Sequence, residues 1–286
     1  MRKRFSYSGT VAVVLIVALA CLVQSARLRA VEEKPSTEPA VISIFPLGSQ
    51  QGSLVQAEIR GTNLEGAYGL WSNTGGLSGE IKNIELIANE SKPSETKKNQ
   101  QIFRVRVQLN INPRQASGAY SLRLITPRGI SNPVPFEVTR EAMIVESGSP
   151  HQTPAEAEPV RLPAVVNGRI QKAGELDYYV FEVARGQELT FEVTVKQEKA
   201  AGLGAPPEFQ PQLNLYETGG SWLDPQQNNW LGAGSLDAPL TYRFDRAGRY
   251  LVQMGGILGK GNPDYAYQLR IAPSRQGIAG GEQSPG

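Results

Sequence analysis

The residues best suited to contact a ligand lie in a short polar segment that carries two tryptophans. These residues are Trp222, Asp224, Asn228, Asn229 and Trp230. The indole rings could stack on sugar rings or on a proline-rich peptide while the carboxylate and the amides form hydrogen bonds, since tryptophan combines a large apolar area with one donor. The alternative is that one or both indoles fold over the end of a β-sandwich. The segment is our candidate contact loop.

Nucleophilic and zinc chemistry are disfavoured by residue type. The chain holds one histidine, His151 beside Pro150, and one cysteine, Cys21. A Ser-His-Asp triad needs the histidine fixed between a nucleophile and an acid, and no serine sits in a Gly-x-Ser-x-Gly elbow. A zinc site built from one histidine and no cysteine would be atypical. We therefore expect His151 to be a solvated residue, and no catalytic residue is assigned.

Paired carboxylates could in principle hydrolyse a glycosidic bond. Candidates such as Glu182, Glu192 and Glu217 alternate with apolar residues along expected strands. This alternation indicates a solvated sheet face instead of a cleft. An unrecognised carboxylate-dependent hydrolase is kept as an alternative function.

The N-terminus has the pattern of an export signal. Positive charge in Met1–Arg4 precedes an apolar run from Val11 to Val23, which is too short to span a bilayer. We expect a cleaved signal peptide over 1–25 and a secreted, periplasmic or extracellular protein. Lipoprotein anchoring through Cys21 is the less favoured alternative. No stable transmembrane segment is expected after cleavage.

Charge disfavours nucleic acid as a partner. Loss of residues 1–25 removes three basic residues and no acid from a chain of net charge +2, which leaves −1. Without a basic surplus, the protein lacks the electrostatic attraction that dominates nucleic-acid affinity.

Short apolar stretches separated by turn residues predict an all-β fold. After a flexible leader over 26–40, the stretch 102–109 places Phe103, Val105, Val107 and Leu109 on one face, as expected of a strand with one wet face. Trp71 is expected to pack in the core of this first domain, which spans 41–138.

A second series of apolar stretches predicts a second domain over 161–272. Between the two domains, the Pro-, Ser- and Glu-rich stretch 139–160 breaks the periodicity and is expected to be a linker. The stretch 273–286 is expected to be a disordered tail. Many short strands at this spacing are typical of an immunoglobulin-like sandwich followed by a jelly-roll-like sandwich.

Residues of the first domain resemble the IPT/TIG family of immunoglobulin-like domains. The resemblance is carried by Pro46, Gly48, Gly52, Val55, Glu58–Leu64 and Gly66–Ala67, and by Gly118–Pro127 followed by Gly129–Asn132. The glycines permit turns that other residues would strain.

Residues of the second domain resemble the bacterial pre-peptidase C-terminal (PPC) domain. The resemblance is carried by Val166–Ile170, Gly174–Phe181, Ala184–Leu189, Pro211–Tyr216, Ala247–Val252 and Asp264–Leu269. It implies a jelly-roll-like accessory domain of secreted proteins, often peptidases, that binds without performing chemistry.

The PPC resemblance also suggests a calcium site, because some members of that family bind calcium. Calcium takes six to eight oxygen ligands. The candidate ligands are Glu175, Asp177, Asp224 and Asp264, although Glu175 stands where the family pattern often has aspartate. No cofactor is otherwise required. These acids could bind calcium only if folding gathers them.

The sequence therefore favours an exported, non-catalytic binding or adhesion protein whose sandwich loops contact a protein, polysaccharide or cell-envelope ligand. An accessory subunit that targets or regulates a separate secreted peptidase is the second hypothesis. The carboxylate-dependent hydrolase is the third.

Overall fold

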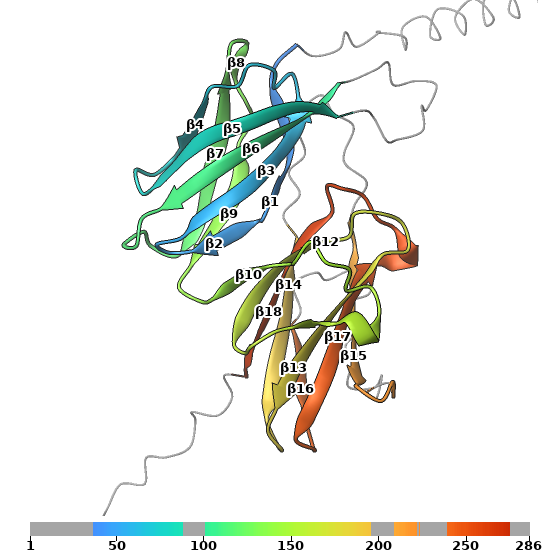
Figure 1. Cartoon of the computed structure of the whole chain (residues 1–286). Coiled ribbons are helices and arrows are strands. Elements are labelled where there is room, and N and C mark those ends of the chain that lie inside the picture. Colours follow the sequence, from blue (N-terminus) through green and yellow to red (C-terminus); the bar gives the residue numbers. More distant parts are fainter. Residues whose placement is uncertain (1–36, 88–100, 196–208, 222, 224–238, 275–286) are drawn as a thin grey trace, which may run out of the picture. The chain divides into compact units, whose positions relative to one another are not determined.

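The computed structural model describes residues 37–87, 101–195, 209–221, 223 and 239–274. In these residues the chain forms strands and two short 3-10 helices, η1 (Pro154–Glu156) and η2 (Ile257–Gly259) (Figure 1). None of the helices in this described part has the length and hydropathy needed to cross a membrane. The predicted all-β fold class is confirmed.

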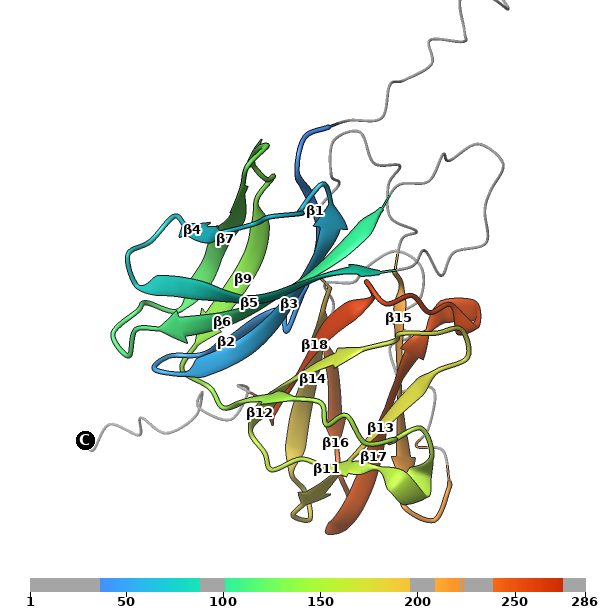
Figure 2. The ribbon, with the colours of Figure 1, turned by 45° about the horizontal axis from the view of Figure 1, so that its top comes forward.

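Residues 40 to 139 form two antiparallel-dominated sheets that enclose one core. The first sheet has the order β1 (Ala40–Phe45), β3 (Leu54–Thr62), β6 (Ile102–Ile111), β5 (Leu77–Ile87). The second has the order β2 (Gly48–Gln50), β9 (Val134–Thr139), β7 (Gly118–Thr126), β4 (Gly69–Ser72), and β8 (Gly129–Ile130) also pairs with β7. Strands β3, β6 and β5 run side by side in Figure 2.

The alternation predicted for β6 is present in the structure. Phe103, Val105, Val107 and Leu109 are buried, and they meet residues such as Phe136 of the opposite sheet in one core cluster. Burial of alternate side chains gives a sheet one apolar face and one solvated face. The expectation for Trp71 was wrong, because this side chain is 44% exposed on β4.

Two further sheets enclose the second core. One has the order β10 (Met143–Val145), β12 (Ala164–Arg169), β18 (Ala266–Pro273), β14 (Glu188–Thr194), β16 (Leu240–Arg243). The other has the order β11 (Glu158–Pro159), β13 (Leu176–Val183), β17 (Gly248–Gly256), β15 (Pro211–Glu217). Buried aromatic rings fill the space between them, including the contacting pairs Phe181–Phe191 and Phe244–Tyr250.

The stretch 139–160 contains strands as well as irregular chain. Strand β10 pairs in parallel with β12, and β11 pairs in parallel with β13, so the stretch adds one strand to each sheet of the second sandwich. The backbone N–H of Tyr178 also donates to the His151 carbonyl, 2.8 Å away. The stretch expected to be a linker is therefore bound to the second sandwich along much of its length.

Candidate metal centre

The sole histidine is buried in the second sandwich, so the expectation that His151 is solvated was wrong. His151 is 7% exposed, and its ring lies against the Tyr179 ring, with the two ring centroids 5.4 Å apart. The error arose because 139–160 was expected to be a free linker. Once β10 and β11 pair with the sandwich, the chain between them is held against β13.

One nitrogen of the His151 ring faces two carboxylates. Nδ1 lies 3.0 Å from the Ser149 carbonyl oxygen, which can only accept, so Nδ1 carries a hydrogen and donates it. Nε2 lies 3.5 Å from Asp177 Oδ1 and 3.8 Å from Glu146 Oε2. In the part of the chain that the structure describes, Nε2 has no hydrogen-bond partner. In a neutral ring, Nε2 presents a lone pair to two carboxyl groups.

Asp177 is held in place by buried tyrosines. It lies on β13 and is 1% exposed, and its Oδ2 accepts a hydrogen bond of 2.7 Å from the Tyr267 hydroxyl. The hydroxyls of Tyr267 and Tyr179 lie 2.7 Å apart. Gly168 makes room for this pair, because a Cβ at that position would overlap the Tyr267 ring. The result is that Asp177 Oδ1 is the oxygen left to face the imidazole.

Glu146 is positioned by the end of β10. Its backbone N–H donates to the Asn167 carbonyl of β12 over 2.9 Å. Both of its carboxylate oxygens lie 3.1 Å from the Arg169 backbone N–H. Glu146, His151 and Asp177, which we call the His151 cluster, each offer one ligand atom, and these atoms all lie within 4.8 Å of one another.

The surroundings of the cluster disfavour its negative charge. Burial first, and then the charge of Asp177, raise the pKa of the Glu146 carboxyl from 4.5 to about 8. Burial raises the pKa of Asp177 from 3.8 to about 7, although the Tyr267 hydrogen bond and His151 act in the opposite direction. Burial also raises the pKa of Tyr267 and Tyr179 well above 10.0, so both phenols stay protonated donors. A cation between the carboxylates would relieve this destabilisation.

Of the predicted calcium ligands, the structure brings only Asp177 into the cluster. Besides burial, the charge of Glu175 raises the pKa of Asp177, but Glu175 Oε2 accepts a 2.9 Å hydrogen bond from the Lys172 backbone N–H. Asp264 forms contacts outside the cluster. Its Oδ1 lies 2.8 Å from Arg60 Nε and accepts a 2.5 Å hydrogen bond from Ser43 Oγ. Asp224 lies outside the described residues. Among the described residues, the ligand atoms that come together are those of Glu146, His151 and Asp177, and the four-acid set that includes Asp224 stays a prediction.

The contact loop predicted around the two tryptophans is not among the described residues. Trp222, Asp224, Asn228, Asn229 and Trp230 all lie outside the described residues. Their role stays a prediction.

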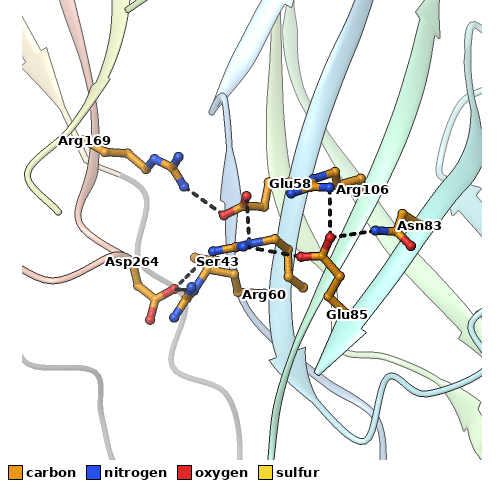
Figure 3. Close-up of polar contacts among 9 residues, drawn as sticks. Ser43, Glu58, Arg60, Asn83, Glu85, Arg106, Arg169 and Asp264 are labelled. Atoms are coloured by element: carbon orange, nitrogen blue, oxygen red, sulfur yellow. Dashed lines mark hydrogen bonds and ion pairs between the residues drawn. The ribbon is translucent and has the colours of Figure 1, made fainter. Parts of the chain in front are cut away.

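Asp264 belongs to a second polar cluster, on strand β3 and its neighbours (Figure 3). This cluster, called the β3 network below, consists of Ser43, Glu58, Arg60, Asn83, Glu85, Arg104, Arg106, Arg169 and Asp264. In it, Arg169 Nη1 lies 2.9 Å from Glu58 Oε1, and the guanidinium also covers the Phe45 ring at 4.2 Å. Arg169 therefore contacts both clusters, through its side chain here and through its backbone N–H at Glu146.

The chain matches no protein-family model and no curated protein sequence. Similar solved structures include the pre-peptidase C-terminal domain of a collagenase from Bacillus anthracis, at 18% identity and a TM-score of 0.26 over 44% of this chain and 99% of that one. The periplasmic inhibitor of g-type lysozyme from Aeromonas hydrophila is 15% identical, with a TM-score of 0.28 over 46% of this chain and 100% of that one. The protein SGBP-B of a mixed-linkage glucan utilization locus in Bacteroides ovatus, solved with a heptasaccharide, is 9% identical, with a TM-score of 0.25 over 82% of this chain and 75% of that one.

These likenesses are distant. A PPC domain is among the similar structures, whereas none of the three tests the resemblance of residues 41–138 to the IPT/TIG family, which stays a prediction. Identities of 18% and below with TM-scores below 0.3 leave the function to be inferred from the chain's own residues.

Proposed function

We propose that the protein is an exported, non-catalytic binding protein whose second sandwich is completed by a divalent cation. Glu146, His151 and Asp177 hold this cation. Loops and edge strands of the sandwiches contact a protein, polysaccharide or cell-envelope ligand.

The orientation of the His151 ring is the observation that supports a cation site. Its Nδ1–H is committed to the Ser149 carbonyl, so a neutral ring turns the Nε2 lone pair toward Glu146 and Asp177. Three electron-rich atoms in a buried site repel one another unless a proton or a metal cation lies among them. Metal-bound histidines commonly donate their other N–H to a backbone carbonyl in this way.

The cation would fasten the segment 143–160 to the second sandwich. The pairings that hold this segment are short, because β10 has three residues and β11 has two. Glu146 follows β10, His151 lies between the two strands, and Asp177 belongs to β13. An ion among them links separate parts of the fold, so its binding free energy adds to the free energy of unfolding.

Exposed apolar side chains on the first sandwich support a binding role. Tyr68, Trp71 and Ile130 are 70, 44 and 58% exposed. Strands β4 and β8, which carry Trp71 and Ile130, both pair with β7. Aromatic side chains with a polar atom are favoured at contact surfaces, because they bury area while keeping a hydrogen bond. The predicted loop 222–230 would be a second contact surface.

The burial of the His151 cluster supports a non-catalytic role for its two carboxylates. Glycosidases place two carboxyl groups on either side of a substrate in an open cleft. Asp177 is 1% exposed and the Glu146 side chain 9%. A groove of about 460 Å³ opens elsewhere, lined by residues including Glu141, Glu192 and Arg270. Substrate would not reach the His151 cluster.

Thermal unfolding with and without divalent cations tests whether the folded chain binds such an ion. The purified chain is stripped with a chelator, dialysed, and melted alone and with calcium, zinc or magnesium. A rise in melting temperature with at least one ion is expected, because an ion that binds only the folded state stabilises it. Identical melting temperatures in all samples would contradict the proposal.

Binding is tested by co-sedimentation with an isolated cell-envelope fraction. The wild-type chain is expected to sediment, and Trp71→Ala or Trp230→Ala is expected to weaken sedimentation by removing a contact aromatic. A secreted peptidase added as competitor distinguishes the accessory-subunit hypothesis. Failure of the wild-type chain to bind either preparation would contradict this part of the proposal.

A further inference from the structure

The donor atoms of the His151 cluster do not suit calcium. They are one imidazole nitrogen and two carboxylate oxygens. Calcium takes six to eight oxygen ligands, whereas imidazole suits zinc and other first-row transition metals. Zinc is bound by combinations of histidine nitrogen and carboxylate oxygen, with four ligands in total. The type of donor therefore favours a transition metal.

The spacing of the donors also fits a small ion with few ligands. Metal–ligand bonds of about 2.0–2.2 Å in a tetrahedron place ligand atoms roughly 3.3–3.6 Å apart. Nε2 of His151 lies 3.5 Å from Asp177 Oδ1 and 3.8 Å from Glu146 Oε2. The two distances from Nε2 are thus close to those of a zinc site, and all three donor atoms lie within 4.8 Å of one another.

A hydrogen bond turns one oxygen of Asp177 away from the imidazole. Asp177 Oδ2 accepts from Tyr267, which leaves Oδ1 for the ion. Glu158, the other acid near the cluster, accepts from the Ser147 backbone N–H with both of its oxygens, at 3.2 and 3.0 Å. The cluster itself supplies two carboxylates and one imidazole, so calcium would have to find most of its six to eight oxygens among other groups.

We propose that the His151 cluster binds zinc or a chemically similar first-row transition metal, in place of the calcium implied by the PPC resemblance. The ligand atoms are His151 Nε2, Asp177 Oδ1 and Glu146 Oε2. This inference rests on the cation site of the proposed function and names the ion it takes. His151 sets the preference for a transition metal over calcium, because it supplies the nitrogen ligand.

The experiment titrates chelator-stripped full-length protein with zinc, cobalt, calcium and magnesium. Zinc and cobalt are expected to raise the melting temperature at concentrations at least tenfold below those at which calcium acts. Bound cobalt is expected to show the visible absorption of a four-coordinate ion. Because the chain has one histidine and one cysteine, a Cys21→Ser variant leaves His151 as the sole strong nitrogen or sulfur side-chain ligand.

The variant His151→Asp tests the role of the nitrogen. It removes the imidazole nitrogen from the cluster and is expected to weaken the binding of zinc and cobalt by at least tenfold. A cooperative melting transition without metal shows that the variant folds. The matched control is Glu192→Gln, which changes a carboxylate of the same sandwich that pairs with Arg270 instead of the cluster. It is expected to leave the zinc response unchanged.

The outcomes separate the two proposals. If calcium stabilises the chain at least as strongly as zinc and cobalt, the transition-metal inference is overturned and the cation site stands. A His151→Asp variant that keeps the zinc preference would also overturn it. If no divalent ion changes the melting temperature, both proposals fail, and the cluster is held by a proton shared between His151 and the carboxylates.

Discussion

The two polar clusters that share Arg169 are built on opposite principles. In the β3 network, opposite charges alternate, with Arg60 at 2.8 Å from Asp264 and Arg106 at 2.9 Å from Glu85. In the His151 cluster, two carboxylates face one imidazole. The β3 network is partly open to solvent, and the His151 cluster is buried. The more buried cluster thus has the less balanced charges.

Arg169 does not remove this imbalance, because its guanidinium is used elsewhere. The side chain pairs with Glu58, and only its backbone N–H reaches the Glu146 carboxylate. Burying like charges costs far more than pairing opposite charges near the surface gains. The β3 network therefore balances its own charges, whereas the acids of the His151 cluster have to be neutralised by protons or by the cation that we propose.

The largest expected effect comes from Asp177→Asn. The amide cannot supply an anionic ligand, so the variant should lose the cation-dependent rise in melting temperature. At a free ion concentration about a thousand times the Kd, that stabilisation is about 4 kcal/mol, or about 10 °C in a chain of this size. Calorimetry with and without zinc measures it. A variant that keeps the full zinc-dependent rise would show that Asp177 is not a ligand.

A smaller effect is expected from Tyr267→Phe, which removes the hydrogen bond to Asp177 Oδ2. The ligands remain, but their orientation is no longer held, and loss of such a partner lowers metal affinity by about 10- to 100-fold. Isothermal titration with zinc gives the affinity. Gln253→Ala is the control: its amide Nε2 donates to Tyr178 outside the His151 cluster, and its loss is expected to leave zinc affinity unchanged. Equal affinities of wild type and Tyr267→Phe would exclude the positioning role.

The pH dependence of the metal-free protein sharpens the contrast between the clusters. Because the folded-state pKa values of Glu146 and Asp177 are raised to about 8 and about 7, the folded chain holds more protons than the unfolded chain. The free energy of unfolding should therefore fall as the pH rises from about 4 to about 8.

Bound metal should reverse this trend, because its ligands must lose their protons. Urea unfolding at several pH values, with and without zinc, measures both slopes. In Asp177→Asn the metal-free slope should be shallower. A wild-type slope that is flat without metal would contradict the effect of burial on the two carboxyl groups.

The smallest effect is expected in the β3 network. Glu85→Gln weakens the ion pairs with Arg104 and Arg106, and the Glu85 side chain is 37% exposed. Exposed ion pairs contribute about 0–1 kcal/mol and are screened by salt. Unfolding at low and high salt should show a change below about 1 kcal/mol and no change in the response to zinc. A larger loss in the free energy of unfolding would mean that the β3 network does not contribute less to stability than the His151 cluster.

Periodicity predicted the strands because it reports which side chains are buried. The alternation from Phe103 to Leu109 identified β6, and the all-β class followed from such stretches. Trp71 shows the limit of this reasoning, because an aromatic on a short strand can lie on either face. The pattern of β4 is too short to decide between them.

The candidate site was only partly predictable, because its ligands come from separate segments. Asp177 lies in a recognisable strand, and its selection came from the PPC resemblance. Glu146 and His151 lie in a stretch whose three-residue strand β10 produces almost no periodic signal. The apolar run Met143–Val145 was the one available sign that this stretch joins a sheet. Neither it nor the sequence spacing indicated that His151 would face Asp177.

The most direct test of a cation in the His151 cluster is a crystal structure of the protein grown with zinc near pH 8, with diffraction recorded on both sides of the zinc absorption edge. The expected result is one anomalous peak about 2 Å from His151 Nε2 and within bonding distance of Asp177 and Glu146. A structure with no peak there, in which His151 Nε2 instead donates a hydrogen bond to one of the two carboxylates, would contradict the cation site.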